Sequence, residues 1–170
     1  NDKKDKKFKD AYFNRFNNIW HHGDFAEIKE TNGLIIHGRS DTTLNPGGVR
    51  LGTAEIYTEV ERFKEVKESI VVGQSWDNDV RIILFIVMNT KFYLTEDLLK
   101  KIKFQIKKNA SPRHVPSKII QVKDIPRTKS GKIVELAVKN ILDGNNIKNK
   151  EALANPEALK QFKNLKELSN

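Results

Sequence analysis

Residues 81–88 read Arg-Ile-Ile-Leu-Phe-Ile-Val-Met, an apolar run that fits a buried strand and is too short to cross a bilayer. Residues 69–73 (Ser-Ile-Val-Val-Gly) and 118–122 (Lys-Ile-Ile-Gln-Val) have the same β-branched character, so each predicts another strand. A polar turn at residues 75–79 joins the first two strands. The middle of the chain is therefore expected to form a three-stranded sheet.

Helical patterns flank these strands. Residues 53–63 place apolar side chains at helical spacing behind Thr53, a residue type that caps helices. Residues 95–108 form an amphipathic pattern behind Thr95, and residues 133–142 form another that ends near a glycine. Strands and helices in this mixture predict a small α+β domain whose elements pack in two layers.

The two ends of the chain differ from this centre. Residues 24–39 alternate around a Thr-Asn-Gly turn, which predicts a β-hairpin. The hairpin has too little sequence around it to build its own core, so we expect residues 1–40 to be the trailing edge of something larger. Residues 41–144 then form a separate small domain. Residues 145–170 form a C-terminal helical extension, in which Pro156 starts the last helix.

The composition narrows the classes of function. The 170 residues contain no cysteine, which excludes disulfides, thiolate zinc sites and cysteine nucleophiles within this chain. The formal net charge of +9 fits nucleic acid, a membrane surface or an anionic small molecule. The lysines are scattered and form no arginine-rich stripe, so neither nucleic acid nor a membrane is an expected partner. No hydrophobic signal core follows the charged N-terminus, and a soluble, cytoplasmic protein is the simplest interpretation.

Residues 126–132 read Pro-Arg-Thr-Lys-Ser-Gly-Lys and are the most informative stretch for function. Glycine and serine let a loop approach a ligand closely, and three cations within six residues suit a phosphate or carboxylate. The stretch is not a P-loop, because the upstream glycine is missing and Ile133 follows Lys132. On local composition alone, an ordinary basic surface turn stays an alternative.

Two further stretches could meet a nucleotide. Residues 38–41 (Gly-Arg-Ser-Asp) precede a glycine turn, and a strand that ends in Gly-Arg can aim a guanidinium at a ribose or phosphate. Residues 20–24 (Trp-His-His-Gly-Asp) place Asp24 where it can accept hydrogen bonds from sugar hydroxyls. Adjacent histidines on an extended chain point to opposite faces, so no metal site is expected there.

Conventional hydrolytic machinery is missing from the sequence. There is no nucleophile elbow and no Ser-His-Asp arrangement. Two pairs of glutamates, Glu59 with Glu61 and Glu65 with Glu68, are expected to lie on solvated helical surface.

Taken in order, these motifs resemble the adenylate-forming superfamily of acyl-CoA synthetases, luciferases and peptide-synthetase adenylation domains. Its members carry a Thr-Gly-Asp-like motif, a Gly-Arg-x-Asp hinge, a glycine turn leading into a Glu-Ile helix, and Pro-x-Thr-x-Ser-Gly-Lys. The matching stretches here are residues 20–24, 38–41, 48–56 and 126–132. Residues 111–116 (Ser-Pro-Arg-His-Val-Pro) and 155–157 (Asn-Pro-Glu) are similar to the acetoacetyl-CoA synthetase branch.

The resemblance implies a reaction in two halves. A carboxylate, acetoacetate in this branch, attacks the α-phosphate of ATP, and the thiol of CoA then attacks the acyl-adenylate. The implied co-substrates are ATP with Mg²⁺, and CoA, and the implied partner is the protein's own N-terminal domain. Because the family's phosphate loop and acyl pocket lie in that domain, residues 41–144 are expected to be a mobile C-terminal lid that is inactive alone.

The resemblance also implies roles for individual residues. Lys132 is the implied adenylation lysine, between the carboxylate and the α-phosphate, and Asp41 is the implied hinge between two domain positions. The implied nucleotide contacts are Asp24, Arg39 and Arg50, and the implied CoA contacts are Gly48 and Lys107.

Two other functions stay open. An acetyl- or other short-chain acyl-CoA synthetase shares the Leu-Gly-Thr-Ala-Glu-Ile run at residues 51–56, and the acyl pocket that would discriminate lies outside this chain. A basic nucleic-acid-binding module would instead bind DNA or RNA with strong salt dependence.

Overall fold

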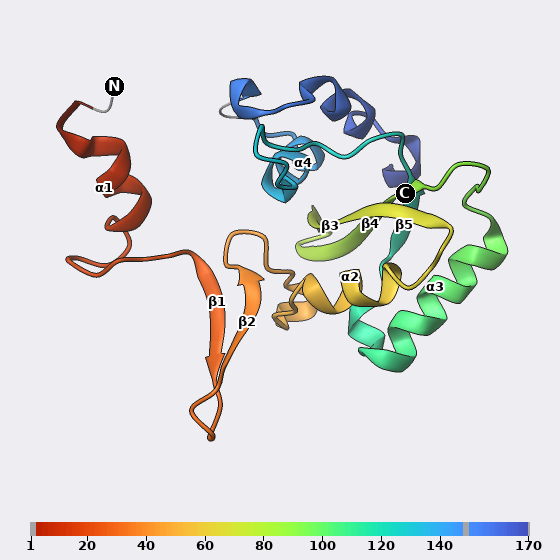
Figure 1. The fold of residues 1–170 in the computed structure, drawn as a ribbon, viewed down its shortest axis with the longest axis horizontal. Coiled ribbons are helices and arrows are strands. Elements are labelled where there is room, and N and C mark those ends of the chain that lie inside the picture. The colour runs from red at the N-terminus through yellow and green to blue at the C-terminus, as the bar shows by residue number, and fades with distance from the viewer. Residues whose placement is uncertain (1–2, 148–149, 170) are drawn as a thin grey trace.

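The computed structural model describes residues 3–147 and 150–169. A three-stranded sheet lies at its centre, in the order β3 (Val66–Trp76), β4 (Asp79–Met88) and β5 (Lys118–Gln121). β3 and β4 pair antiparallel as a hairpin, and β5 runs parallel to β4 (Figure 1). The three predicted strands and the α+β class are confirmed.

The hairpin between β3 and β4 turns more tightly than predicted. Only Asp77 and Asn78 lie outside the strands, with φ angles of 49° and 57°. Positive φ at both central residues gives the hairpin turn whose twist matches that of the paired strands, and Asp and Asn tolerate this conformation. The strands therefore reach into the polar stretch at residues 75–79.

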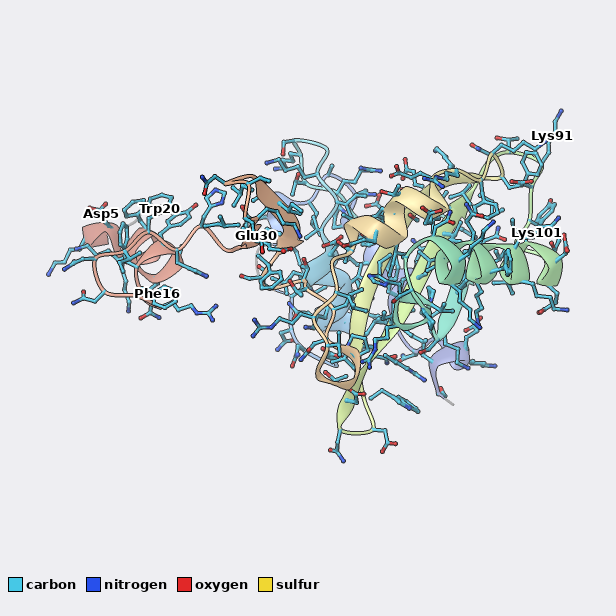
Figure 2. The ribbon with its side chains drawn as sticks, turned by 90° about the horizontal axis from the view of Figure 1, so that it is seen from below. Asp5, Phe16, Trp20, Glu30, Lys91 and Lys101 are labelled. Carbon is cyan, nitrogen blue, oxygen red and sulfur yellow. The ribbon has the colours of Figure 1, made fainter. Side chains whose placement is uncertain are left out.

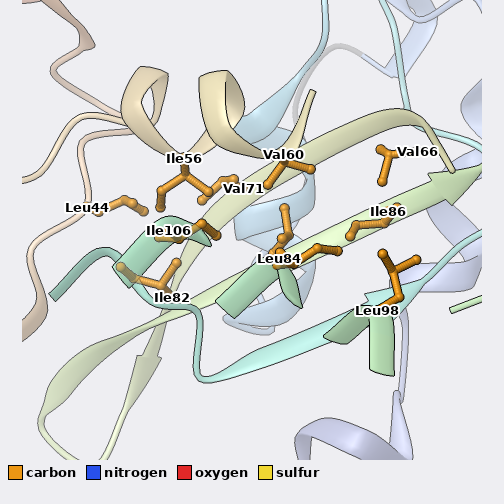
Figure 3. Packing of buried hydrophobic residues seen from close by; sticks show 11 residues of the cluster. Leu44, Ile56, Val60, Val66, Val71, Ile82, Leu84, Ile86, Leu98 and Ile106 are labelled. Carbon is orange, nitrogen blue, oxygen red and sulfur yellow. The ribbon is translucent and has the colours of Figure 1, made fainter. Parts of the chain in front are cut away.

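One face of the sheet is covered by α2 (Ala54–Val60) and α3 (Glu96–Asn109). Figure 3 shows this core, in which Ile56 of α2 packs in one cluster with Leu84 of β4. Thr95 caps α3 as predicted, because its hydroxyl accepts the N–H of Leu98 at 3.3 Å. Thr53 occupies the N-cap position of α2 but makes no capping hydrogen bond, so that part of the prediction is wrong.

The opposite face is covered by α4 (Glu135–Leu142) and by the C-terminal residues, as Figure 1 shows. The domain therefore has three layers, and the prediction of two layers is wrong. The apolar run of β4 carried the necessary information, because a strand buried on both faces does not alternate between apolar and polar residues.

The C-terminal residues are part of this core. Three short 3₁₀ helices, η4 (Lys150–Ala152), η5 (Pro156–Phe162) and η6 (Lys166–Leu168), follow α4. Phe162 is 1 % exposed and meets the ring of Phe85 edge-on, with 4.9 Å between ring centroids. Pro156 starts a helix as predicted, and that helix is of the 3₁₀ type.

Glu59 corrects another prediction. Its side chain is buried, and its carboxylate accepts hydrogen bonds from Gln105 at 3.0 Å and Asn109 at 2.8 Å and pairs with Arg62 at 3.1 Å. A buried carboxylate needs such partners to offset its lost hydration. Because two of these partners lie on α3, helical spacing within α2 could not reveal that Glu59 joins the two helices.

The N-terminal residues lie to one side of this domain (Figures 1 and 2). A single turn, η1 (Lys3–Asp5), leads into α1 (Lys6–Tyr12), and β1 (Asp24–Ile28) pairs antiparallel with β2 (Leu34–Arg39). The predicted hairpin is confirmed. Several of its apolar side chains are exposed to solvent, namely Ile28, Leu34, Ile35 and Ile36. In the described residues, no helix is long and apolar enough to cross a membrane.

Candidate functional site

Residues 126–132 form a closed loop that presents Lys132. Arg127 and Ile133 form an antiparallel bridge, and inside it the N–H of Thr128 donates to the carbonyl of Lys132 at 2.8 Å. The Thr128 hydroxyl also accepts the N–H of Lys132 at 3.1 Å. Backbone bonds therefore fix the Cα position of Lys132, while its side chain is exposed. Within the described residues, the ammonium of Lys132 has no hydrogen-bond or ion-pair partner.

The side chain of Arg127 stabilises this loop. One guanidinium nitrogen donates to the carbonyl of Gly131 at 3.0 Å, and another pairs with Glu68 on β3 at 2.8 Å. The cation at position 127 therefore holds the loop against the sheet, and the cation at position 132 is left for a ligand. Local composition alone could not separate these two roles.

Glu135 and Tyr57 lie together in the wall of a pocket of about 610 Å³, whose lining includes Lys132. The Tyr57 hydroxyl donates to Glu135 at 2.5 Å, and Thr42 also hydrogen-bonds with this carboxylate. Burial raises the pKa of Glu135. Burial, together with the neighbouring Glu135, raises the pKa of Tyr57 well above its ordinary value. A chain of contacts thus runs from the pocket to Thr42, the residue after Asp41.

Asp24, Arg39 and Asp41 gather at the base of the hairpin. Asp24 faces Arg39 across the two strands, and the guanidinium of Arg39 binds both carboxylate oxygens of Asp41 at 3.1 and 3.2 Å. This hydrogen bonding raises the pKa of Arg39. His22 lies 2.5 Å from the carboxylate of Asp24. The structure brings these three predicted residues together at the point where the hairpin joins the sheet domain.

The glycine turn lies elsewhere. Leu44 and Leu51 form a two-way backbone bridge that closes the turn, and the N–H of Gly47 donates to both carboxylate oxygens of Asp79, at 2.9 and 3.0 Å. Gly48 is exposed, and no atom lies within 4 Å of the place where a Cβ would be. Arg50 follows and lies over the ring of Phe25 on β1, 5.6 Å from its centroid.

The predicted residues therefore occupy separate places. The loop with Lys132 is tied to Glu68 near the start of β3, whereas the glycine turn is tied to Asp79, just past the far end of β3. At about 3.3 Å per residue, the strand from Glu68 to Trp76 spans roughly 26 Å. Lys107 is exposed on the last turn of α3, on the other face of the sheet from α4. The structure does not bring Lys132, Gly48 and Lys107 together.

Sequence reasoning missed Tyr57, Glu135 and the C-terminal residues that contact the loop. The first two are 78 residues apart, and neither belongs to a recognisable motif. A polar residue inside an apolar helical stripe was the available signal for Tyr57. Nothing in the sequence indicated its partner.

Comparison with known proteins agrees with this geometry. Residues 55–132 match the model of the AMP-binding enzyme C-terminal domain. The whole chain is 59 % identical to the acetoacetyl-coenzyme A synthetase of Rhizobium meliloti and 46 % identical to the acetoacetyl-CoA synthetase of Xenopus tropicalis, spanning 26 % of the length of each. The solved structure of acetoacetyl-CoA synthetase from Streptomyces lividans superposes with a TM-score of 0.85 at 37 % identity, over 95 % of this chain and 25 % of that one.

The chain thus spans about a quarter of the length of the curated relatives it matches. The matched family model begins inside α2 and ends at Lys132, so it contains the sheet and the loop described above. Residues 55–132 are an AMP-binding enzyme C-terminal domain, and the chain belongs to the adenylate-forming superfamily.

Proposed function

We propose that this chain is the C-terminal portion of an acetoacetate–CoA ligase. In this proposal, residues 1–40 are the trailing edge of a large N-terminal adenylation domain, residues 41–144 are its mobile lid, and residues 145–170 are an extension of that lid. Identity along the whole chain to relatives named acetoacetyl-CoA synthetase supports it. The observation that carries it is the loop that fixes the backbone of Lys132 and leaves its ammonium without a partner in the described residues.

The first half-reaction joins acetoacetate to AMP. A carboxylate oxygen attacks the α-phosphorus of ATP, a new O–P bond forms, and pyrophosphate leaves with the electrons of the broken bond. The two reactants are both anions and repel one another. Lys132 between them offsets this repulsion, and a lysine suits the task because its ammonium needs no bidentate geometry.

The second half-reaction transfers the acyl group. The thiolate of CoA attacks the acyl carbonyl, and AMP leaves to give acetoacetyl-CoA. Lys132 must withdraw to admit CoA, so the lid turns about Asp41 and presents the glycine turn instead. Gly48, which has open space beyond its Cα, then lines the path of the pantetheine arm.

The remaining residues take supporting roles in this proposal. Asp24 and Arg39 hold the ribose and phosphates of the nucleotide. Arg50 contacts the nucleotide or CoA in the second state, after leaving Phe25, and Lys107 binds a phosphate of CoA. The Arg39–Asp41 pair is exposed, so it can break at small cost when the hinge turns.

No metal centre of the protein's own is proposed on this part of the chain. Nowhere in the described residues do three or more His, Asp or Glu side chains converge. No step of the reaction is assigned to a metal held by these residues.

The full-length enzyme tests the proposal. Acyl-CoA formation is measured with acetoacetate, acetate and butyrate at matched concentrations, and acetoacetate is expected to give the highest kcat/KM. Preference for acetate or butyrate would contradict the acetoacetate assignment and leave the adenylate chemistry standing. A gel-shift assay at two salt concentrations examines the nucleic-acid alternative, for which salt-sensitive retention of DNA or RNA is the required result.

A further inference from the structure

The C-terminal residues are hydrogen-bonded along the back of the Lys132 loop. Thr128 and Leu153 form an antiparallel bridge. The N–H of Lys129 donates to the carbonyl of Ala152 at 3.1 Å, and the N–H of Ala154 donates to the carbonyl of Arg127 at 2.8 Å. Residues 152–154 therefore act as a short strand beside the loop, on the side away from its own closing bridge.

Asn155 fastens this contact. Its side-chain oxygen accepts the N–H of Arg127 at 2.8 Å, and its nitrogen donates to the carbonyl of Ile125 at 2.9 Å and to the carboxylate of Asp124 at 2.6 Å. Both amide donors and one acceptor site are thus used, which is most of what an asparagine can offer. No other side chain in the described residues bonds to backbone groups on both sides of Pro126.

We propose that Asn155 is a positioning residue for Lys132, an inference that rests on the proposed function. Asn155 fixes the backbone of Arg127, Arg127 pairs with Ile133, and Lys132 directly precedes Ile133 in this paired segment. Asn155 needs no contact with any substrate for this role.

Besides the backbone bonds to residues 152–154, two side-chain contacts hold the loop, and those of Asn155 are stronger than the ion pair of Arg127. The ion pair of Arg127 with Glu68 is about 30 % exposed on both sides, so solvent weakens it. The two hydrogen bonds of the Asn155 side chain to backbone groups join uncharged partners and are partly buried. Without them, the N–H of Arg127 and the carbonyl of Ile125 lose their partners, which is costly for groups shielded from water.

The experiment uses the full-length enzyme with Asn155→Ala, Asn155→Asp, Asp124→Asn and the double variant Asn155→Asp/Asp124→Asn. Asn155→Asp keeps the acceptor for Arg127 and places a second carboxylate against Asp124. The double variant restores an amide opposite a carboxylate with the two partners exchanged. Glu157→Ala, an exposed change two residues away, is the control.

Two measurements are made on each variant. Hydrogen exchange reports the opening of residues 126–133, and we expect roughly tenfold faster exchange in Asn155→Ala, as for loss of about 1.4 kcal/mol of local hydrogen bonding. The adenylation half-reaction is expected to slow about tenfold in kcat with the KM for ATP unchanged, while transfer from supplied acetoacetyl-adenylate to CoA keeps its rate. Asn155→Asp is expected to be at least as slow, and the double variant to recover part of the loss.

Unchanged exchange and unchanged adenylation in Asn155→Ala would overturn the proposal. Equal loss in both half-reactions, or no recovery in the double variant, would also overturn it, because either result indicates a general structural defect. If the wild-type enzyme forms no acetoacetyl-adenylate, the proposed function fails, and hydrogen exchange alone still decides whether Asn155 fixes the loop.

Discussion

The Lys132 loop and the glycine turn at residues 45–50 lie toward opposite ends of β3 and are held in different ways. The loop is fixed along both of its edges, by its own bridge and by the C-terminal residues, and it carries an exposed cation. The turn is fixed at its base and by Asp79, and its outer surface at Gly48 is bare backbone. One region presents a charge at a defined position, and the other keeps space clear.

This difference follows from what each region has to do in the proposed reaction. A cation that offsets repulsion between two anions works only if its backbone does not move during the chemical step. A surface beside which a long, flexible cofactor arm passes needs the absence of side chains more than it needs any group of its own. Because the two demands conflict, one domain meets them with two surfaces.

Lys132→Ala tests the loop half of this comparison and has the largest expected effect. In the full-length enzyme, adenylation is expected to slow by roughly two to three orders of magnitude, since removing a preorganised charge costs about 3–4 kcal/mol. Transfer of the acyl group from supplied acetoacetyl-adenylate to CoA is expected to stay near the wild-type rate. Equal loss in both half-reactions, measured by pyrophosphate release and thioester formation, would contradict the assignment.

Asp41→Pro tests the connection between the two surfaces. A proline fixes φ at position 41. If one of the two domain positions needs another φ, reaching it costs about 3 kcal/mol, which slows the step that depends on it roughly a hundredfold. If the starting conformation accepts proline, adenylation is expected to persist while CoA transfer falls. Asp41→Ala is the control, because it also removes the pair with Arg39 and leaves φ free. Normal CoA transfer in Asp41→Pro would remove the hinge assignment.

Gly48→Ala and Gly131→Ala form a matched pair that sharpens the comparison. Both glycines have positive φ, 75° and 83°, and at both an added Cβ would meet no atom within 4 Å. Each alanine is therefore expected to cost a similar strain, about 1–2 kcal/mol in the free energy of unfolding. If the regions have separate tasks, the same substitution acts on different steps.

The expected outcome for this pair is a crossed pattern. Gly131→Ala slows adenylation about tenfold and spares CoA transfer, whereas Gly48→Ala slows CoA transfer by a similar factor and spares adenylation, consistent with about 1.4 kcal/mol in each case. Single-turnover rates of the two half-reactions measure the pattern. Loss of the same half-reaction in both variants would show that the two regions do not divide the work.

The sequence predicted the elements of this molecule better than their mutual contacts. The three strands, the capped helix behind Thr95 and the hairpin follow from local periodicity, which lies entirely within each segment. The prediction that Glu59 is solvated was wrong because its partners on α3 are about fifty residues away in the sequence. The second covered face of β4 was also missed, although an unbroken apolar run is typical of a strand buried on both faces.

The candidate site shows the same limit. The motif at residues 126–132 indicated an anion-binding loop, but not that Arg127 faces inward and Lys132 outward. Asn155 was read as part of a motif that indicates a family branch, and its three hydrogen bonds depend on a chain reversal that no local pattern encodes. The roles of Asp24, Arg39, Asp41, Gly48, Arg50, Lys107 and Lys132 stay predictions until the half-reactions are measured.

Glu135→Gln probes the partly buried contact of Glu135 with Tyr57 and Thr42, just beyond the Lys132 loop, and has the smallest expected effect. Burial raises the pKa of Glu135 in the folded chain, so the folded state favours its protonated form. The contribution of this protonated carboxyl to the free energy of unfolding is therefore fully present below the ordinary glutamate pKa. It is lost as pH rises through the raised pKa of the folded state. Glutamine stays neutral and can still accept the hydroxyl of Tyr57, so the variant is expected to lose this pH dependence.

Unfolding by urea, followed between about pH 4 and 8, measures the difference. We expect equal stabilities at the acidic end and a growing advantage for Glu135→Gln as pH rises, with Glu157→Gln as an exposed control of equal charge change. Parallel curves for the variant and the wild type would contradict burial of this carboxyl as the source of the pH dependence. A higher free energy of unfolding for Glu135→Gln at high pH would mean that the enzyme keeps a titratable group between the Lys132 loop and Thr42 at a cost in stability. Such a cost is expected if the contact between Glu135 and Thr42 opens when the domain turns.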